Sequence, residues 1–528
     1  MQTRENAFIC IQSNHRGDTM NKNFNSTNWR EHLPVPVYGE HPEYNAFYYK
    51  AWELAHSHLK SIPGMPQDPY MDESLCDTQV WIWDSCFMAL FCKFAGDVFP
   101  GVETLSNFYE VLYGERSLPK IVPSEKEPKW TRAVPGKESD IYIHIADNPP
   151  LFAWAEYENA LYSGDKERIR DLLYNKRFLQ KHYEWFDTSK GGERIRGVFL
   201  PTCLVAEDIG FRWEGGRSGM DNTPRGRKAP RDGTERPDAK DLLWVDALCQ
   251  QALAARSLAR LFRLVGDEEN ALLWDEKFDQ KRDVVEKYYW DASDRFYYDI
   301  DVNSHDFCKV MTAGSFWALT SGVASSERAE QLAAHVRDER AFGGDVPLIS
   351  LARSDGDYYS DGRYWRGGLW LPTAYAALKG LSEYGMHSLT HEAASKILAH
   401  MYATFCEWEP HTIWECYSPE YHRPALTPKG DKTSRPDFCG WSALGPISIY
   451  IEFVLGFCGA DAFTKTLTWE MPENVRGEIG IKNFRFGDII TDVIAKNGVC
   501  TVKSNEPYTL VICGKEYVIP AGETEFKI

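Results

Sequence analysis

The chain has 528 residues, 43% of them hydrophobic and 26% charged, which is the composition of a globular protein large enough for more than one domain. Its formal net charge of −18 argues against a nucleic-acid backbone as the main partner, because the phosphates would be repelled. Aromatic residues make up 14%, and the 18 Trp suit either a large core or a site that stacks on the apolar faces of sugars.

Targeting and metal-binding motifs are not visible in the sequence. Residues 1–14 lack a cationic stretch followed by an apolar run, and no stretch approaches the roughly 18 apolar residues of a membrane span. Met20 is an alternative start, because residues 1–19 show no periodicity. The 13 cysteines form no Cys-x-x-Cys pair, which predicts reduced thiols in a cytoplasmic protein. The 14 histidines have no ligand spacing, so we expect neither a metal nor a cofactor.

From about residue 42 to residue 456 the hydrophobic periodicity is that of helices, broken by Gly, Pro and Asp. The apolar stripe is clearest over 241–265, where Gly266 can end the helix and Asp267 can cap the next one. Twelve helices joined by alternately short and long connections favour a mainly α fold, an (α/α)6 toroid of six hairpins. A bundle or a solenoid is the alternative, although no internal repeat is evident. The predicted helices are 42–61, 81–94, 103–114, 149–163, 166–187, 241–265, 267–289, 309–321, 326–337, 369–384, 388–407 and 440–457.

After Gly459 the pattern changes to short strands. Residues 493–502 read as a strand, an Asn-Gly turn and a second strand. Residues 508–519 read as another hairpin, with its turn at Gly514 and Lys515. We therefore predict three regions: an N-terminal extension over 1–41, a helical domain over 42–459 and a small β-sandwich over 460–528.

Four long connections carry nearly all of the unusual motifs: 115–148, 188–240, 340–368 and 408–439. Loops of this length in a compact domain are usually functional. If alternate hairpin loops share one rim of the toroid, these four line one mouth.

Two of these connections each present one carboxylate among aromatic, Gly, Asn and Arg residues. Asp221 stands in Ser-Gly-Met-Asp-Asn-Thr-Pro-Arg, and Glu415 stands in Thr-Ile-Trp-Glu-Cys-Tyr-Ser-Pro. Acid/base cleavage of a glycosidic bond needs such a pair, one group protonated and the other holding a water. The alternatives are an Asx-turn for Asp221 and a surface acid at a helix end for Glu415.

Two further clusters add candidate contacts to a sugar. The run Tyr-Trp-Arg-Gly-Gly-Leu-Trp over 364–370 offers stacking faces, a fork of donors and glycines that let backbone approach a ligand. The run Trp-Ile-Trp-Asp over 81–84 places an acid at a helix start, where the helix dipole alone would favour it. A structural ion pair for Arg366 and a place in the core for Trp441 are the alternatives. The candidate contact residues are Trp81, Trp83, Asp84, Asn222, Arg225, Tyr364, Trp365, Arg366, Gly367, Trp370, Trp414, Tyr417 and Trp441.

With these motifs the chain resembles the (α/α)6-barrel glycoside hydrolases of families 63 and 37, most closely the mannosylglycerate-hydrolase-like branch of family 63. Matching pieces follow the family's order along most of 75–456, among them Asn-Pro-Pro-Leu over 148–151 and Gly-Trp-Ser over 440–442. The resemblance implies an inverting glycosidase with Asp221 as general acid and Glu415 as general base. It also implies that Asp84, Trp365 and Arg366 contact the sugar.

The acid loop departs from the pattern of these families. The residues Gly-Gly-Arg over 215–217 separate Trp-Glu from Ser-Gly, Gly226 replaces a common aromatic, and Asn148 stands where relatives often have Gln. These changes leave the acid/base pair intact and bear on the leaving-group subsite. The same region concentrates cations, which are either a solvated loop or, as a hypothesis, ligands for a glycerate or uronate carboxylate. The cations are Arg217, Arg225, Arg227, Lys228, Arg231, Arg236 and Lys240.

The sequence thus predicts an inverting, exo-acting glycosidase for an α-linked glucoside or mannoside in a disaccharide or small glycoside. Its two carboxyl groups would lie roughly 6.5–9.5 Å apart. The open alternatives are a trehalase, a sugar epimerase or isomerase using His144 and His411, and a carbohydrate-binding protein that has lost catalysis. A small carbohydrate is the expected partner, with no nucleic acid and no membrane, and no oligomeric state is predicted.

Overall fold

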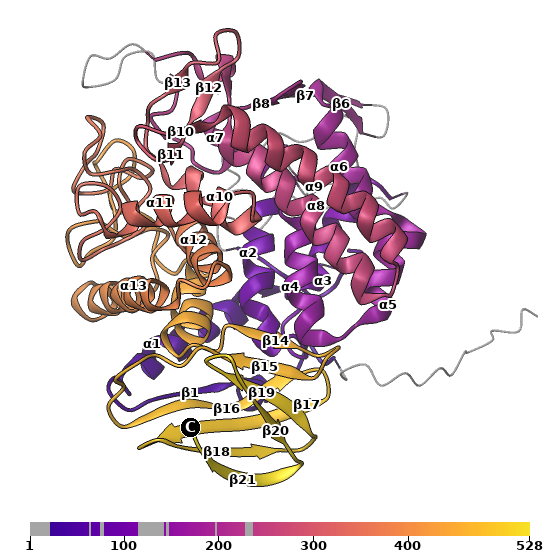
Figure 1. The fold of residues 1–528 in the computed structure, drawn as a ribbon, viewed down its shortest axis with the longest axis vertical. Helices are drawn as coiled ribbons and strands as arrows, with labels where there is room; N and C mark the ends of the chain where they lie inside the picture. Colours follow the sequence, from indigo (N-terminus) through magenta and orange to yellow (C-terminus); the bar gives the residue numbers. More distant parts are fainter. Residues whose placement is uncertain are drawn as a thin grey trace, which may run out of the picture.

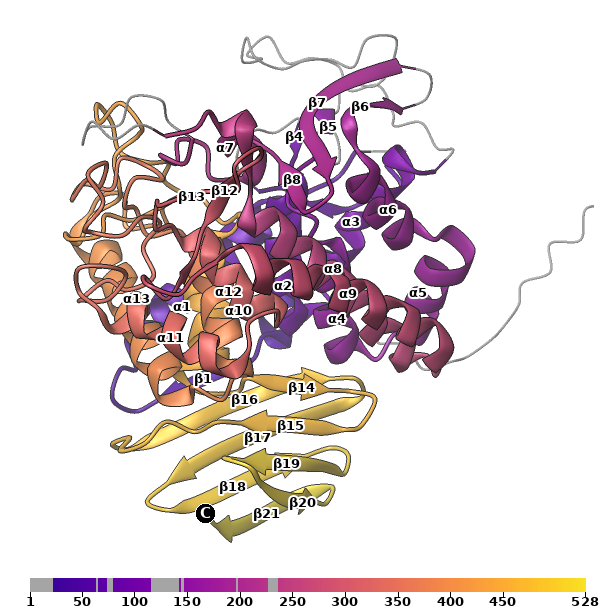
Figure 2. The same ribbon diagram turned by 45° about the horizontal axis from the view of Figure 1, so that its top comes forward.

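The computed structural model describes residues 22–62, 65–73, 79–114, 142–143, 147–195, 198–226 and 236–528 of the protein. Helices form one part of the molecule, and the strands of the C-terminal residues form a separate part against it (Figure 1). A turned view shows the same division, with the strands β14 to β21 stacked on one side of the helices (Figure 2). None of the helices within these residues is long and apolar enough to cross a membrane.

Each segment that the periodicity predicts to be helical contains a helix. Three of them differ in detail. The segment 166–187 is interrupted at Arg177, whose φ of 55° is left-handed. The segment 309–321 starts its first turn at Ala313, and the segment 440–457 is largely a π-helix. The helices are α1 (Tyr44–Ser57), α2 (Ile82–Cys92), η2 (Lys93–Ala95), α3 (Gly101–Leu112), α4 (Phe152–Ser163), α5 (Lys166–Arg170), η3 (Asp171–Lys176), α6 (Phe178–Thr188), α7 (Gly215–Ser218), α8 (Val245–Leu264), α9 (Glu268–Tyr288), η5 (Ala313–Phe316), α10 (Trp317–Ser321), α11 (Ser326–Arg337), α12 (Leu371–Glu383), α13 (His387–Glu407), η6 (Ser442–Leu444) and η7 (Gly445–Val454).

Helices buried on all sides alternate, along most of the chain, with helices that keep an exposed face. Every residue of α2, α10 and η7 is buried, whereas α9 and α11 bury only one face. A helix without a polar face needs protein all around it. The buried helices contact one another in a closed series: α2 with α4, α4 with α8, α8 with α10, α10 with α12, α12 with η7, and η7 with α2. Outside this series α3 packs on α2, α9 on α8, and α13 on α12.

The connection 188–240, read from the sequence as a loop, instead contributes most of a six-stranded sheet. Its strand order is β13-β12-β9-β8-β7-β6. Buried Leu204 and Ala206 alternate with more exposed neighbours, which is the pattern of a strand with one covered face. The strands are β6 (Lys190–Ile195), β7 (Val198–Glu207), β8 (Gly210–Arg212), β9 (Leu242–Leu243), β12 (Asp299–Asp301) and β13 (Phe307–Cys308). Short pairs join β2 (Leu59–Lys60) to β3 (Tyr70–Met71), β4 (Gln79–Val80) to β5 (Tyr142–Ile143), and β10 (Trp290–Asp291) to β11 (Phe296–Tyr297).

The C-terminal strands build two packed sheets, and the N-terminal strand β1 (Val35–Tyr38) joins the edge of one of them. The strand orders are β1-β16-β17-β18-β21 and β14-β15-β19-β20. Rings of Phe486 and Tyr508 meet between the two sheets at 5.7 Å. The predicted turn at Asn497 and Gly498 is present with both φ angles positive, but the second hairpin turns at Cys513 and Gly514, one residue earlier than predicted. The strands are β14 (Gly459–Asp461), β15 (Thr466–Trp469), β16 (Glu478–Phe486), β17 (Ile489–Lys496), β18 (Val499–Ser504), β19 (Tyr508–Ile512), β20 (Lys515–Ile519) and β21 (Gly522–Lys527).

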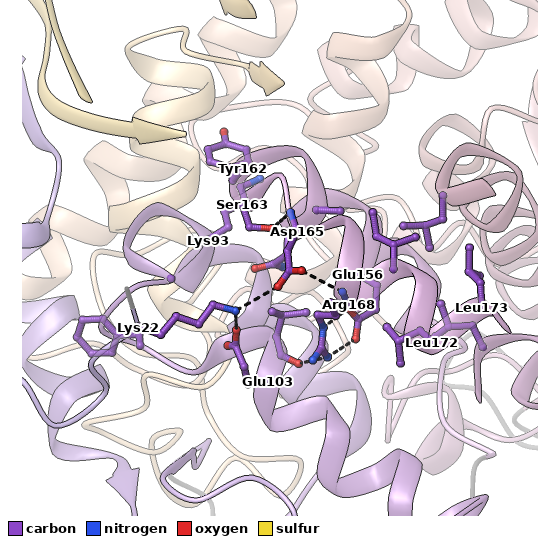
Figure 3. Close-up of a pocket in the computed structure, with 18 residues that line it drawn as sticks. Lys22, Lys93, Glu103, Glu156, Tyr162, Ser163, Asp165, Arg168, Leu172 and Leu173 are labelled. Carbon is purple, nitrogen blue, oxygen red and sulfur yellow. Dashed lines mark hydrogen bonds and ion pairs between the residues drawn. The ribbon is translucent and has the colours of Figure 1, made fainter. Parts of the chain in front are cut away.

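The N-terminal residues are tied to both parts of the molecule. Strand β1 (Val35–Tyr38), within the predicted extension, pairs antiparallel with β16. Lys22 Nζ lies 2.7 Å from Glu103 and 3.6 Å from Asp165, beside a largely apolar cavity between α3, α4 and α5 (Figure 3). Arg168 pairs with Glu156 in the same cavity, at 2.7 Å. Lys93, also labelled in Figure 3, pairs with Glu158 and Glu452. Because these charged groups all have partners within the protein, we assign this cavity no catalytic role.

Candidate active site

Asp84 lies in the first turn of α2, and its side chain is buried, with 3% of the residue exposed. Burial raises the pKa of this carboxyl well above its ordinary value, and the nearby carboxyls of Asp221, Glu415 and Asp72 raise it further. The N-terminal end of a buried helix therefore holds a carboxyl in the electrostatic field of both predicted catalytic residues.

Asp221 follows the short helix α7 in a loop that passes over the indole of Trp83. Gly219 makes this path possible: its φ is 81°, and a Cβ there would lie 2.4 Å from Trp83 Cζ2. Solvent reaches the Asp221 side chain, yet the protein around it desolvates the carboxyl. This desolvation, with the charge of Glu415, raises the pKa of Asp221 to about 7. Near neutral pH the group can thus hold a proton and lose it.

Glu415 is buried and fixed at both its side chain and its backbone. The Tyr364 hydroxyl donates to Oε1 at 2.8 Å, and the Arg435 backbone N–H donates to Oε2 at 3.3 Å. The Glu415 carbonyl accepts from Trp441 Nε1 at 2.8 Å and Ser442 Oγ at 3.1 Å. The pKa of Glu415 is raised, because the effect of burial exceeds that of the Tyr364 bond and of the charge and backbone N–H of Arg435, which lower it. These donors favour the ionised form that a base needs.

Four indoles pack together beside the carboxyls. The Trp83 ring centre lies 6.2 Å from that of Trp365 and 5.9 Å from that of Trp441. Trp365 stacks on Trp370 at 4.1 Å with nearly parallel planes. All four side chains are buried. Trp370 therefore packs against Trp365 within the protein, and Trp441 belongs to the same cluster of rings. Trp370 and Trp441 directly precede α12 and η6, so this cluster also stands at helix starts.

Three predicted sugar contacts have internal partners instead. Arg225 is buried, pairs with Asp246 at 2.7 Å and Asp299 at 3.5 Å, and lies over the Trp244 ring. Such a cation neutralises buried carboxylates and is not available to a ligand. Tyr417 is fully buried, and its hydroxyl accepts from the Trp414 backbone N–H at 3.1 Å. Gly367, with φ 128°, faces Tyr358, since a Cβ there would lie 2.7 Å from that ring.

Other predicted contacts are placed at or beside the carboxyls. Arg366 is partly exposed, donates to the Asn222 carbonyl at 3.3 Å and lies 3.9 Å from Asp357, so the ion-pair alternative holds in part. Trp81 is partly exposed at the start of α2. Trp414 is buried, and its Nε1 has no hydrogen-bond partner among the described residues.

Sequence reasoning missed two contributors and one contact of a third. Arg435, in an unremarked stretch before Pro436, holds Glu415 through its backbone, and Asp72 adds to the charge around Asp84. No motif marks either residue. Tyr364, predicted to contact sugar, also hydrogen-bonds to the predicted base, a contact that the sequence did not predict.

Of the two histidines of the epimerase alternative, His411 does not join this cluster. His144 lies outside the described residues, and His411 is exposed, with its ring bonded to the Phe405 carbonyl and paired with Glu409. Within the described ranges, no group of three or more His, Cys, Asp or Glu side chains could hold a metal ion.

Comparisons with known proteins show the family to which the chain is similar. Residues 77–428 match the family model described as the mannosylglycerate hydrolase MGH1-like glycoside hydrolase domain. The mannosyl-oligosaccharide glucosidase of Saccharomyces cerevisiae is 26% identical, over 50% of this chain and 33% of its own length. The mannosylglycerate hydrolase of Rubrobacter radiotolerans is 30% identical, over 28% of this chain and 32% of its own. The chain spans less than two thirds of the length of such curated relatives.

A solved structure shares the fold at low identity. The mannosylglycerate hydrolase of Thermus thermophilus, from glycoside hydrolase family 63 and in complex with Tris and D-glycerate, superposes with a TM-score of 0.53 at 20% identity. The match covers 76% of this chain and 99% of that one.

Proposed function

Because this chain belongs to the family of mannosylglycerate hydrolase MGH1-like glycoside hydrolases, we propose that it is an inverting, exo-acting glycosidase for an α-linked glucoside or mannoside. The observation that carries the proposal is that three carboxyls are close enough for their charges to interact. Asp221 and Glu415 both raise the pKa of Asp84, and Glu415 raises the pKa of Asp221. Paired carboxyls with shifted pKa values, here beside four Trp side chains, are typical of a site that cleaves glycosidic bonds.

Asp221 is the proton donor in this proposal. A pKa of about 7 leaves a substantial fraction of the carboxyl protonated at neutral pH, ready to protonate the glycosidic oxygen. Glu415, whose oxygens accept from Tyr364 and Arg435, is the base that deprotonates a water on the opposite face of the ring. Attack from that face inverts the anomeric centre.

Asp84 has a different role from these two. Burial raises the pKa of this carboxyl well above the ordinary value, which favours its protonated form, and a protonated carboxyl can donate a hydrogen bond. We propose that it binds a sugar hydroxyl, with Trp81 and Arg366 as further contacts because their side chains are partly exposed.

The fold that carries these residues is, in our proposal, an (α/α)6 toroid. The closed series of contacts among buried helices, with α3, α9 and α13 packed outside, supports it. Some residues of the site stand at the starts of the buried helices, as with Asp84 at α2 and Trp370 at α12.

The substrate is, in our proposal, a disaccharide or small glycoside, with trehalose as the second candidate because cytosolic neutral trehalases are among the relatives. An anionic leaving group remains a hypothesis. Of the seven cations first considered, Arg225 and Arg236 are paired with Asp residues, and Arg217 lies 3.6 Å from Asp147. Arg227, Lys228 and Arg231 lie outside the described residues. Replacing Arg227 and Lys228 together would raise KM for charged substrates only, if the hypothesis holds.

We also propose a cytoplasmic location. The basis is the sequence pattern of unpaired cysteines, and the eleven cysteines of the described residues are all free thiols.

The experiment is a panel of α-linked disaccharides and glycosyl-glycerates tested on the wild type, Asp221→Asn and Glu415→Gln. Each variant should lose on the order of 10²–10⁴ in rate or more. A dinitrophenyl glycoside separates the roles, because its leaving group needs no protonation: Asp221→Asn should regain much of its rate on it, and Glu415→Gln should not. Near-normal turnover of Asp221→Asn on ordinary disaccharides would refute the assignment.

A further inference from the structure

The loops that carry Asp221 and Glu415 are joined through Asn222 and Tyr364. Asn222, the neighbour of the proposed acid, donates from Nδ2 to the Arg363 carbonyl at 2.9 Å. Its Oδ1 accepts from the Trp365 backbone N–H at 2.8 Å. One side-chain amide thus holds the backbone on both sides of Tyr364, whose hydroxyl donates to Glu415.

The conformation of Tyr364 is unusual for a residue with a large side chain. Its φ is 69°, and that of Arg363 is 33°, both in the left-handed region that non-glycine residues rarely adopt. Such backbone persists only where the surroundings impose it, and it gathers at functional sites. Here the imposing contacts are the Asn222 amide and Trp370, whose Nε1 donates to the Tyr364 carbonyl at 3.0 Å.

The Tyr364 ring is held as firmly as its backbone. It meets the Trp370 ring edge to face, at 4.6 Å between centres. The segment after it is bridged to the loop of Glu415 by two backbone hydrogen bonds between Leu369 and Tyr417, at 2.8 and 3.1 Å. The hydroxyl that reaches Glu415 therefore has little freedom to follow that carboxylate if it moves.

We propose that Tyr364, clamped by Asn222, is a positioning residue that fixes the Glu415 carboxylate relative to Asp221. We call the hydrogen bonds from Asn222 to the backbone around Tyr364, and from Tyr364 to Glu415, the bridge. The proposal rests on the proposed function, because it takes Asp221 and Glu415 as the acid and the base. The contacts then act in series: Asn222 holds Tyr364, and Tyr364 holds Glu415. Replacing either Asn222 or Tyr364 therefore frees the Glu415 carboxylate to move. In an inverting reaction the separation of the carboxyl groups must leave room for one water, so this bridge sets that separation.

The bridge has a signature in the pH profile that a merely structural residue lacks. The Tyr364 hydrogen bond favours ionised Glu415, so its removal raises the pKa of that carboxyl. The base must be ionised to act. The acidic limb of kcat/KM therefore moves to higher pH in Tyr364→Phe. It also moves in Asn222→Ala, because Asn222 hydrogen-bonds to the backbone on both sides of Tyr364.

The test measures kcat, KM and the pH profile of Tyr364→Phe, Asn222→Ala and the double variant. Each single variant should lose kcat by roughly tenfold to a hundredfold, with a smaller change in KM. The double variant should be little worse than the poorer single one, because residues in series do not add. Tyr298→Phe is the matched control: its hydroxyl also donates to a carboxylate, Asp294 at 3.0 Å, away from these residues. It should leave kcat and the profile unchanged.

The outcomes separate this inference from the proposed function. If Glu415→Gln is inactive while Tyr364→Phe keeps the wild-type pH profile and kcat, the bridge is refuted and the glycosidase assignment stands. If Glu415→Gln stays active, the proposed function fails and the bridge with it. Tyr364→Phe removes one hydroxyl only, so the test holds even where Asn222→Ala lowers the yield of folded protein.

Discussion

Glu415 raises the pKa of Asp221, although the two residues are far apart in the sequence. The protonation of Asp221 therefore depends on the charge of Glu415. Long connections from different parts of the helical region bring them together, one after α7 and one before η6.

Activity should fall as the pH rises above about 7. Asp221 has a pKa of about 7, and a proton donor is lost when it ionises. The measurement is kcat/KM against pH on a disaccharide with a poor leaving group. A dinitrophenyl glycoside serves as the control substrate, and its basic limb should be much weaker. A profile flat to pH 9 on both substrates would contradict the role of Asp221.

Asp221→Asn should be more stable than the wild type at alkaline pH. The folded-state pKa of Asp221 is raised above its unfolded value, so the folded protein binds the proton more tightly. The stability contributed by that proton is present below the unfolded pKa and is lost as the pH rises towards 7. The amide carries no charge to desolvate. Thermal unfolding at pH 5 and pH 8 should show an advantage of the variant that grows with pH, and an equal difference at both would count against it.

Gly219→Ala should damage the protein where Gly216→Ala does not. Alanine at position 219 would need a φ of 81° and would strike the Trp83 ring, which costs about 1–3 kcal/mol of stability and displaces the Asp221 loop. At Gly216 a Cβ meets nothing within 4 Å. Chemical denaturation and kcat for both variants check this expectation. Equal behaviour of the two would show that the Asp221 loop does not depend on its contact with Trp83.

Arg225→Met should impair folding and not substrate binding. Removal of this guanidinium leaves Asp246 and Asp299 buried without their cation, a loss of about 3–5 kcal/mol. Lys240→Met, at an exposed position in the same predicted basic stretch, is the control and should change neither stability nor KM. A stable Arg225→Met protein with a raised KM would instead restore the predicted sugar contact.

The helices were predictable because each buries a stripe that repeats with the helical period, as over 241–265. The strands β6 to β9 were not predictable. Of these, β8 and β9 have only two or three residues each, and their pairing is set by the tertiary structure. Arg177 interrupts a periodic segment through its backbone angle, which no apolar pattern reports.

Within the site, the residue types indicate which carboxyls are candidates, but not which groups hydrogen-bond to them. The sequence predicts Asp221 and Glu415 because each lies in a long connection among aromatic or Gly residues. Whether Arg225 meets a sugar or a buried Asp depends on Asp246 and Asp299, and nothing in the loop itself encodes that choice. The bond from Tyr364 to Glu415 likewise joins two motifs that look independent in the sequence.

The most direct test of the account is the anomer released first. NMR spectra taken during the earliest turnover of an α-linked substrate would show the configuration of the product before mutarotation. With Asp221 donating the proton and Glu415 directing a water from the opposite face, the β-anomer should appear first. The α-anomer as first product would mean that a covalent or same-face route operates, and would contradict the account.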